Sequence, residues 1–234
     1  MLNIIGTPIG NLDDISYRQA RVLNSSDIIL AEDTRSAMNL LSRTKSLLQS
    51  DEDLPLRKKP NVMSYYKDVE MLKLPLVMKW LKEEKIVSLI SEAGMPLISD
   101  PGYLLVKACI REDIAFTVIP GPSAVITAII YSGFQCDEFM FLGFLPKKQN
   151  DLIRVFEKVR TVQSSFPKTV FVAFESPKRI QKTLEYLKTI LPNAQIVIAR
   201  ELTKKFEEIL RGTTSVLKNT ELKGEITLVI GPST

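Results

Sequence analysis

The sequence predicts an α/β protein of two units, the first built on a mostly parallel sheet with flanking helices and the second on a mixed sheet. In the first half, apolar stretches of four or five residues alternate with stretches of helical periodicity, which is the βαβ pattern of a parallel sheet. In the second half, five apolar stretches are separated by only two long helical segments, so several strands can pair antiparallel. We expect the boundary after Pro120, which gives domains of residues 1–120 and 121–234.

The strands expected in the first half are short and apolar, and they span residues 3–5, 27–31, 61–65, 86–90 and 115–119. Between them, apolar residues recur at helical spacing over residues 15–23, 34–48, 70–84 and 101–111. Ser16 or Asp14 is the expected N-cap of the first helix, because short polar side chains satisfy the free N–H groups there. Residues 50–60 mix charges with prolines and are expected to form a surface loop.

The second half opens with a helix expected over residues 123–131. Its expected strands are residues 139–144, 169–174, 195–200, 207–212 and 225–230. The two long helices are expected over residues 152–162 and 178–190.

The composition excludes several kinds of chemistry. The chain has 234 residues, of which 45% are hydrophobic and 25% charged, so it is long enough and apolar enough to fold around a core. It contains no histidine, which excludes histidine as a general base, a metal ligand or a pH switch. Cys109 and Cys136 are too far apart for a metal-ligand pair and too few for a disulfide framework. We therefore expect two reduced thiols and no metal site.

Neither a signal peptide nor a membrane span is expected. The N-terminal residues MLNIIGTPIG carry no basic segment and only a short apolar stretch. The most apolar segment, residues 116–134, is interrupted by Pro120-Gly121-Pro122-Ser123, which leaves too short a helix to cross a bilayer. These features predict a cytoplasmic protein.

The net charge of +4 is unevenly distributed. Residues 1–120 carry 15 basic and 16 acidic side chains, whereas residues 121–234 carry 16 basic and 11 acidic side chains. A basic half favours a polyanionic partner such as nucleic acid, since lysine and arginine neutralise phosphates. Solvated helix faces explain the same imbalance without a partner.

Four loops rich in glycine and proline follow expected strands, at residues 6–12, 91–96, 99–102 and 120–124. In open parallel sheets, ligands bind beyond the carboxyl ends of the strands, so these loops predict a shared small-molecule cleft. The chain has no G-x-x-x-x-G-K-[ST] and no G-x-G-x-x-G after the first strand, which disfavours a P-loop hydrolase and a Rossmann dinucleotide enzyme. A Ser-His-Asp triad is impossible without histidine.

Seven sequence blocks, in order from Gly6 to Ile230, resemble the ribosomal RNA small subunit methyltransferase I family. They read GTPIGNLDDIS with ILAEDTR, SEAGMPLISDPGYLLV, VIPGPSAVITAIIYSG, FLGFLPKK, FVAFESPKRI, ARELTKKFEEILRGT and GEITLVI. The resemblance implies a tetrapyrrole-methylase-like fold of two α/β domains with a cofactor cleft between them, assembled as a homodimer. It also implies methyl transfer from S-adenosylmethionine to the ribose 2′-hydroxyl of a cytidine in 16S ribosomal RNA. The implied partner is therefore ribosomal RNA or the 30S subunit.

Carried over block by block, the resemblance assigns twelve residues to the cofactor: Pro8, Ser91, Glu92, Ala93, Gly94, Met95, Ile98, Ser123, Ala124, Phe174, Ala199 and Glu225. Ser123 and Ala124 begin a helix whose free N–H groups suit a carboxylate. Ordinary core packing is the alternative interpretation of Phe174 and Ala199.

The acceptor side is assigned to charged residues that follow expected strands. Glu32, Asp33 and Arg35 are the catalytic candidates, although Asp33 can equally be a helix N-cap. The candidates for substrate binding are Lys147, Lys148, Glu175, Arg179, Arg200 and Glu201. Lys147 and Lys148 are expected to contact RNA phosphate, and a structural Arg–Glu pair is the alternative for some of the others.

Three features depart from the family pattern. Glu92 and Met95 stand where the family usually has aspartate and threonine, and Lys178 often has a histidine counterpart. Many members also continue with a basic extension beyond the position of Thr234. Two alternatives therefore stay open, a methylase of a tetrapyrrole or other small metabolite, and a non-catalytic module that binds S-adenosylmethionine or RNA.

Overall fold

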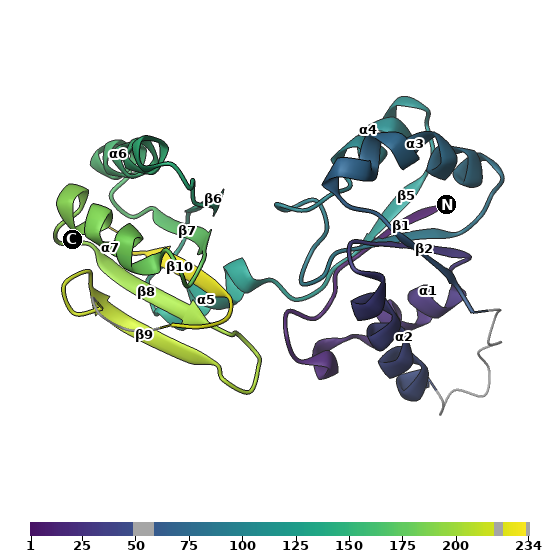
Figure 1. Cartoon of the computed structure of the whole chain (residues 1–234), viewed down its shortest axis with the longest axis horizontal. Coiled ribbons are helices and arrows are strands. Elements are labelled where there is room, and N and C mark those ends of the chain that lie inside the picture. The colour runs from purple at the N-terminus through teal and green to yellow at the C-terminus, as the bar shows by residue number, and fades with distance from the viewer. Residues whose placement is uncertain (49–58, 218–221, 233–234) are drawn as a thin grey trace. The chain divides into compact units, whose positions relative to one another are not determined.

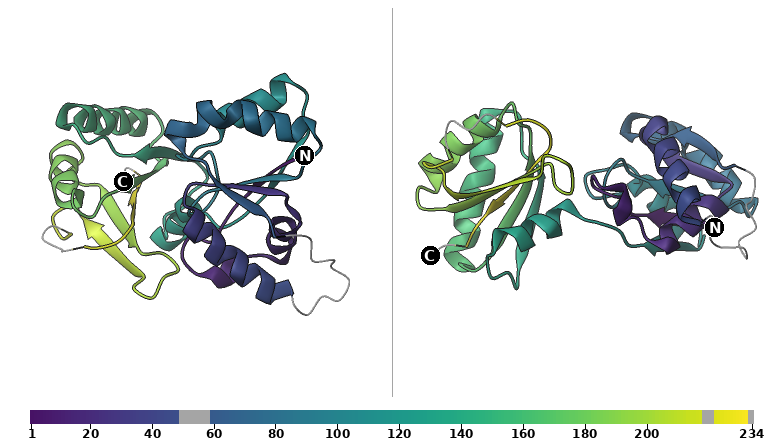
Figure 2. Two further views of the ribbon diagram at one scale, coloured as in Figure 1. Left: turned by 45° about the vertical axis from the view of Figure 1, so that its right-hand side comes forward. Right: turned by 90° about the horizontal axis from the view of Figure 1, so that it is seen from below.

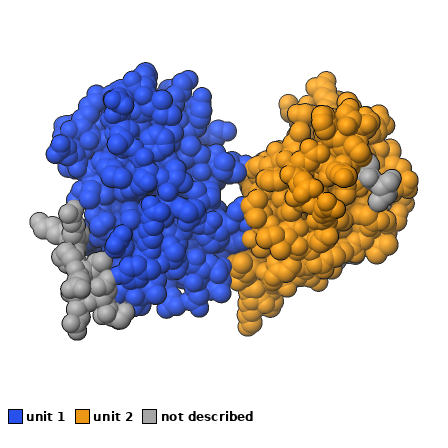
Figure 3. All heavy atoms as spheres, turned by 180° about the vertical axis from the view of Figure 1, so that it is seen from behind, with its two compact units in different colours: residues 1–123 blue, residues 124–234 orange. Residues whose placement is uncertain are grey.

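The computed structural model describes residues 1–48, 59–217 and 222–232. The chain divides into two compact units, residues 1–123 and 124–234, shown in blue and orange in Figure 3. The boundary expected from the sequence lies three residues earlier, after Pro120. Most of the loop expected over residues 50–60 falls outside the described residues.

The sheet of the first unit has five strands in the order β3-β2-β4-β1-β5, and all its pairings are parallel. The strands are β1 (Leu2–Ile5), β2 (Ile28–Ala31), β3 (Asn61–Ser64), β4 (Val87–Ile90) and β5 (Phe116–Ile119). Since parallel strands end at the same edge of a sheet, the loops after β1, β2, β4 and β5 gather at one edge. This confirms the parallel sheet predicted for the first half.

Helices cover both faces of this sheet (Figure 1). They are α1 (Tyr17–Ser25), α2 (Thr34–Leu48), α3 (Lys67–Lys82) and α4 (Tyr103–Arg111), with a 3₁₀ turn at Leu12–Asp14. Side chains alternate along the strands, so Leu2 and Ile4 pack in the core under α3 and α4, whereas Ile5 packs under α1 and α2. Strands β1, β2 and β4 are buried on both faces, as their short and mainly apolar sequences predict.

The N-cap of α1 is Ser16, one of the two expected candidates. Its hydroxyl accepts a hydrogen bond from the N–H of Gln19 at 3.2 Å, and the Gln19 side chain accepts one from the N–H of Ser16 at 2.5 Å. This reciprocal capping box fixes where the helix begins.

The sheet of the second unit is mixed, as predicted. Its strands, β6 (Phe139–Phe144), β7 (Val170–Glu175), β8 (Gln195–Arg200), β9 (Glu208–Thr213) and β10 (Ile226–Ile230), lie in the order β6-β7-β10-β8-β9. The pair β6–β7 is parallel and the other pairs are antiparallel. The helices of this unit are α5 (Ala124–Ser132), α6 (Gln149–Ser165) and α7 (Ile180–Ile190).

The main core of the second unit lies between its sheet and the pair α6 and α7, which run on the same side of the sheet (Figure 2). Phe156 of α6 and Leu187 of α7 are fully buried there beside Phe171 of β7. Helix α5 packs against β7, β8 and β10.

Each expected helix and strand is present, with its ends within three residues of the predicted ones. Among the described residues, no helix combines the length and the apolar character that crossing a membrane requires.

Candidate functional site

Two loops at the carboxyl edge of the first sheet are joined by a backbone bridge. The N–H of Thr7, after β1, donates to the carbonyl of Gly94, after β4, at 2.8 Å, and the N–H of Gly94 donates back at 3.1 Å. The hydroxyl of Ser91 also donates to the Gly94 carbonyl, at 3.0 Å. The loops after β1 and β4, which the sequence predicts to share a cleft, are therefore held together.

The loop after β5 joins them through a glycine pair. A Cβ atom on Gly6 would lie 2.7 Å from the Cα of Gly121, so only glycine permits this approach. The Gln19 amide of α1 donates to the carbonyls of Gly6 at 2.8 Å and of Pro120 at 3.1 Å. The sulfur of Met95, which departs from the family pattern, lies 2.6 Å from the same Cβ position on Gly6. Met95 therefore packs over this junction.

The segment after β4 carries backbone strain. Leu97 and Ser99 adopt φ angles of +71° and +72°, a left-handed conformation that non-glycine residues rarely take. They flank Ile98, whose side chain is 55% exposed. Such strain persists only where the surrounding structure enforces it, and it is common at ligand-binding loops.

Glu70 anchors the end of this strained segment, and sequence reasoning missed it. The Glu70 side chain projects from α3 and is 5% exposed. Its Oε1 atom accepts hydrogen bonds from the N–H groups of Gly102 at 3.1 Å, Leu104 at 2.9 Å and Leu105 at 3.3 Å. A carboxylate from another helix thus caps α4, where Gly102 has no side chain to do so. No local pattern in the sequence predicts this contact between α3 and α4.

Three carboxylates lie at the same edge of the first sheet. The pKa of Asp100 is raised from 3.8 to about 6, mainly by burial and also by the nearby charges of Glu32 and Glu92, while a hydrogen bond from Ser91 acts in the opposite direction. Glu32 directly follows β2 and is exposed, as is Glu92. This group was only partly predicted, because Asp100 was not among the candidate residues.

Asp33 is the N-cap of α2. Its Oδ1 atom accepts a hydrogen bond from the N–H of Arg35 at 2.6 Å and a longer one from the N–H of Ser36 at 3.4 Å. The capping interpretation left open by the sequence is therefore the role this structure shows for Asp33. Arg35 is exposed at the start of the same helix.

The cofactor candidates of the first unit lie within or beside these loops, with differing exposure. Pro8, Ser91 and Gly94 are buried, whereas Glu92 and Ala93 are exposed. Ser123 is the last residue of the first unit, and Ala124 begins both the second unit and α5.

The cofactor candidates of the second unit share one edge of its sheet. Thr227 of β10 pairs with Phe174 of β7 on one side and with Ala199 of β8 on the other, so these three residues form a row on one face. Ala199 is 1% exposed, which is the exposure of a core residue. Glu225, just before β10, has a largely exposed side chain and pairs with Lys204 at 3.0 Å.

Two substrate-binding candidates near this edge are engaged in local contacts. The Glu201 carboxylate accepts hydrogen bonds from the N–H of Glu225 at 2.9 Å and from Lys204 at 3.0 Å. The Arg200 guanidinium pairs with Glu208 at 3.0 Å and donates to the carbonyl of Lys223 at 3.2 Å. Both side chains stabilise the turn before β10.

Glu175 and Arg179 form an internal pair, the structural alternative raised for these residues. The Glu175 side chain is fully buried, pairs with Arg179 at 2.5 Å and accepts a hydrogen bond from the Thr183 hydroxyl at 2.6 Å. Arg179 in turn donates to the carbonyls of Leu145 and Pro146 at 3.0–3.1 Å. The pair therefore fixes the turn that precedes Lys147 and Lys148, in place of offering its own charges to a substrate.

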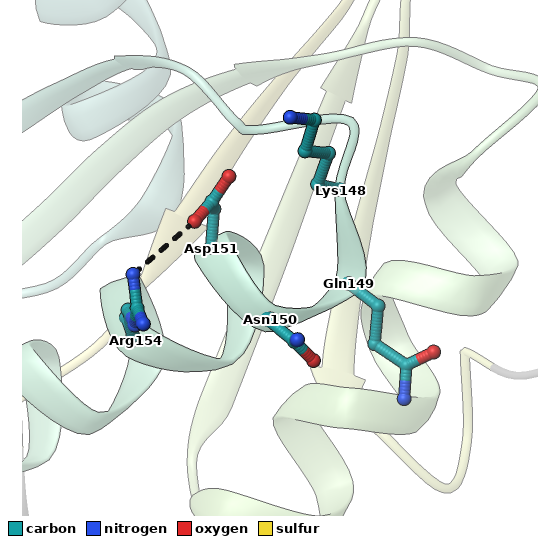
Figure 4. Close-up of a pocket in the computed structure, with 5 residues that line it drawn as sticks. All are labelled: Lys148, Gln149, Asn150, Asp151 and Arg154. Carbon is teal, nitrogen blue, oxygen red and sulfur yellow. Dashed lines mark ion pairs between the residues drawn. The ribbon is translucent and has the colours of Figure 1, made fainter.

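Lys147 and Lys148 are exposed at the start of α6. Lys148 lines a surface pocket of about 310 Å³ with four residues of the first turns of α6, Gln149, Asn150, Asp151 and Arg154 (Figure 4). Asp151 and Arg154 face one another at 3.5 Å. The Lys148 side chain makes no capping hydrogen bond to the helix.

Comparison with known proteins identifies the family. Residues 1–218 match the family model described as Tetrapyrrole (Corrin/Porphyrin) Methylases. The chain is 39% identical over 241 residues to the ribosomal RNA small subunit methyltransferase I of Hydrogenobaculum sp., covering 98% of this chain and 94% of that protein. It is 41% identical to the protein of that name from Thermotoga maritima, over 98% of this chain and 97% of that protein. The chain belongs to the ribosomal RNA small subunit methyltransferase I family.

Members of the methyltransferase I family take their methyl group from S-adenosylmethionine, and the chain is an S-adenosylmethionine-dependent methyltransferase. A family relative from Halalkalibacterium halodurans is 36% identical, and the chain covers 75% of its length. Solved structures show the same fold: the methyltransferase CobJ aligns with a TM-score of 0.71 at 15% identity, over 99% of this chain and 93% of CobJ. Uroporphyrin-III-C-methyltransferase from Thermus thermophilus aligns with a TM-score of 0.62 at 16% identity, and the alignment covers 98% of this chain and 93% of that protein.

Negative charge gathers at the carboxyl edge of the first sheet, where the carboxylates of Glu32, Glu92 and Asp100 lie. The glycines at positions 6 and 121 let the loops after β1 and β5 pass in close contact, with the Met95 and Gln19 side chains packed against the junction. In the described part of the chain, no three His, Cys, Asp or Glu side chains are grouped to hold a metal ion.

Proposed function

We propose that the chain methylates the ribose 2′-hydroxyl of a cytidine in 16S ribosomal RNA of the small ribosomal subunit. The observation that carries this proposal is the 41% identity to the Thermotoga maritima ribosomal RNA small subunit methyltransferase I, over nearly the full length of both proteins. The two solved methyltransferases, at 15% and 16% identity, support the fold alone.

The loops after β1, β4 and β5 are the proposed donor site. When bound, S-adenosylmethionine supplies a methyl group already activated by its sulfonium. The Thr7–Gly94 bridge and the Glu70 cap hold the loop residues 91–102 in one arrangement, and fixed loops orient reactants without a further entropy cost. Pro8 and Ser123 are proposed donor contacts beside these loops, and the assignment of Ala124, Phe174 and Glu225 to the donor remains a prediction from the family resemblance.

The acceptor hydroxyl must release its proton as the new O–C bond forms and the C–S bond of the sulfonium breaks, which leaves a neutral thioether. A positioned base that takes this proton adds roughly 10²–10⁴ in rate. Because the chain has no histidine, carboxylates at the edge of the first sheet are proposed to accept this proton. Asp100 is the favoured one, because its raised pKa of about 6 gives it more affinity for a proton than an ordinary aspartate. Glu32, Asp33 and Arg35 remain proposed residues of the acceptor side.

The test is a methylation assay with tritiated S-adenosylmethionine and 30S subunits from a strain that lacks its own enzyme. We expect label in the RNA, recovered after nuclease digestion as 2′-O-methylcytidine. A parallel reaction contains a tetrapyrrole in place of subunits. Label in the tetrapyrrole alone would overturn the RNA assignment, and absence of donor binding by calorimetry would leave the non-catalytic alternative.

Two substitutions test whether these carboxylates accept the proton. Asp100→Asn and Glu32→Gln are expected to lower turnover while the affinity for S-adenosylmethionine changes little. Asp68→Asn, at an exposed carboxylate of α3, is the matched control and should keep full activity. Equal turnover in all three variants would exclude these carboxylates as proton acceptors.

A homodimer in the cytoplasm is the proposed working form. In support, α5 exposes apolar side chains, with Ile126 at 45% and Ile130 at 74% exposure, and such a face suits burial against a second copy. Light scattering after gel filtration should give twice the mass of the chain, and Ile130→Lys should reduce it to that of one chain. A monomeric wild-type protein would contradict the proposal.

A further inference from the structure

An aromatic ring that belongs to neither core stands at the end of the edge strand β6. Phe144 is 65% exposed, although the neighbouring strand β7 is almost wholly buried. The register of β6 on β7 shifts between Phe141 and Phe144, and Gly143 between them adopts a φ of +69°. This bulge places Phe144 opposite Phe174, and bulges commonly redirect a side chain beside a functional site.

The ring of Phe144 rests on other aromatic rings. Its centroid lies 5.2 Å from that of Phe174, with an angle of 56° between the planes. Phe174 in turn meets Phe141 edge-on, with centroids 5.0 Å apart. Phe144 is thus supported from one side by Phe174 and exposed to solvent over most of its surface.

The chain that follows Phe144 is held rigidly. The N–H of Leu145 donates to the carbonyl of Phe174 at 3.0 Å, and the Leu145 side chain is 2% exposed. Arg179, paired with the buried Glu175, holds the carbonyls of Leu145 and Pro146. Five donor groups in a planar fork make arginine suited to such multiple contacts. The position of the exposed ring relative to the next residues is therefore fixed.

The residues that follow this turn are basic. Lys147 and Lys148 are exposed, and Lys148 lines the pocket that also includes Arg154 (Figure 4). An exposed aromatic ring beside lysines is the combination with which proteins bind single-stranded nucleic acid, since the ring stacks on a base and the lysines neutralise phosphates. An apolar protein partner would need no such positive charge.

We infer that Phe144 is a stacking platform for an unpaired base of the RNA substrate, with Lys147 and Lys148 on the adjoining phosphates. This inference rests on the proposed function and adds a binding subsite to it. Glu175 and Arg179 act as positioning residues that hold the platform and the lysines on one rigid turn. The ring accepts any base, because every base presents a π face, so Phe144 contributes affinity and placement more than sequence selection.

The test measures binding of the full chain to a fluorescein-labelled single-stranded oligocytidylate of about ten nucleotides by anisotropy. The same preparations give the KM for 30S subunits and the dissociation constant for S-adenosylmethionine. Phe144→Ala should weaken oligonucleotide binding and raise the KM about tenfold or more, with donor affinity unchanged. Phe144→Trp should restore binding, because the indole ring also stacks.

The matched control is Phe166→Ala, at an aromatic residue that is 57% exposed at the end of α6. It should leave all three measurements unchanged. Lys147→Ala and Lys148→Ala should each reduce the slope of log affinity against log salt by about 0.7, the value for one phosphate contact on a single strand, whereas Phe144→Ala should leave that slope intact.

Several results would overturn the inference. One is equal RNA affinity for Phe144→Ala and Phe166→Ala while the wild-type protein still methylates 30S subunits, which leaves the proposed function standing. Another is a defect with intact subunits but none with the oligonucleotide, which would indicate a ribosomal protein as partner. A third is a loss of dimer mass at unchanged RNA affinity. Failure of the wild-type protein to methylate or bind RNA would instead contradict the proposed function itself.

Discussion

The Oε1 atom of Glu70 in α3 lies 2.9 Å from the backbone nitrogen of Leu104 in α4, and it accepts two further N–H groups from the same helix start. One buried carboxylate thus satisfies three backbone donors that α4 cannot satisfy itself. This contact fixes the end of the loop that begins at Ser91, so it connects the stability of the first unit to the geometry of the proposed donor site.

Removal of that carboxylate should be costly. Glu70→Ala leaves buried N–H groups unpaired, and we expect it to lower the free energy of unfolding by about 2–3 kcal/mol. Glu70→Gln keeps an acceptor oxygen and should lose about half as much. Glu83→Ala, at an exposed ion pair with Lys79, is the control and should lose less than about 1 kcal/mol. Urea unfolding measures all three, and equal losses for Glu70→Ala and Glu83→Ala would disprove the cap.

Asp33 permits its two proposed roles to be separated. Asparagine caps helices about as well as aspartate, so Asp33→Asn should change the free energy of unfolding by less than about 0.5 kcal/mol, whereas Asp33→Ala should lose about 1 kcal/mol. If the charge also serves the acceptor, Asp33→Asn lowers turnover at least tenfold while donor affinity is unchanged. Turnover at the wild-type level would leave Asp33 as a cap alone.

The raised pKa of Asp100 predicts a pH dependence of stability. The folded protein binds this proton more tightly than the unfolded chain between about pH 4 and pH 6, because the pKa rises from 3.8 to about 6 on folding. The contribution of Asp100 to the free energy of unfolding therefore falls as the pH rises through that window. The stability of the Asp100→Asn variant relative to the wild type should therefore increase as the pH rises from 4 to 7. Denaturant unfolding across this range checks the sign, and a constant difference would contradict it.

The glycine pair under the loops predicts a steric effect. A methyl group on Gly6 meets the backbone of Gly121, which cannot move aside, so Gly6→Ala should destabilise by about 3 kcal/mol and weaken S-adenosylmethionine binding. In Gly133→Ala the added methyl group meets no atom within 4 Å, and the only strain is the φ of +72° at this position. This variant should lose about 1 kcal/mol of unfolding free energy and keep its affinity for S-adenosylmethionine. Calorimetry with the donor, alongside thermal unfolding, distinguishes the two variants.

Local patterns predicted the elements well, for identifiable reasons. The bounds of α2 and β8 match those expected, because periodic apolar residues and their polar flanks act within a few residues of one another. The site was predicted less completely. Asp100 was missed because an aspartate before a proline in a loop reads as an ordinary turn residue, and its raised pKa depends on burial and on Glu32, far away in the sequence.

The α/β class, the order of the elements, the parallel and mixed sheets and the family could all be predicted from the sequence, because they follow from local periodicity and from motifs that are contiguous in the chain. Three contacts became visible in the folded protein alone: Glu70 caps α4, Gly6 meets Gly121, and Arg179 holds the turn before Lys147. Such contacts join residues that are distant in the chain, and their free energy depends on burial and on exact atomic separation. Burial and atomic separation cannot be predicted from a short stretch of sequence, because both arise only when the sheet brings its strand ends together.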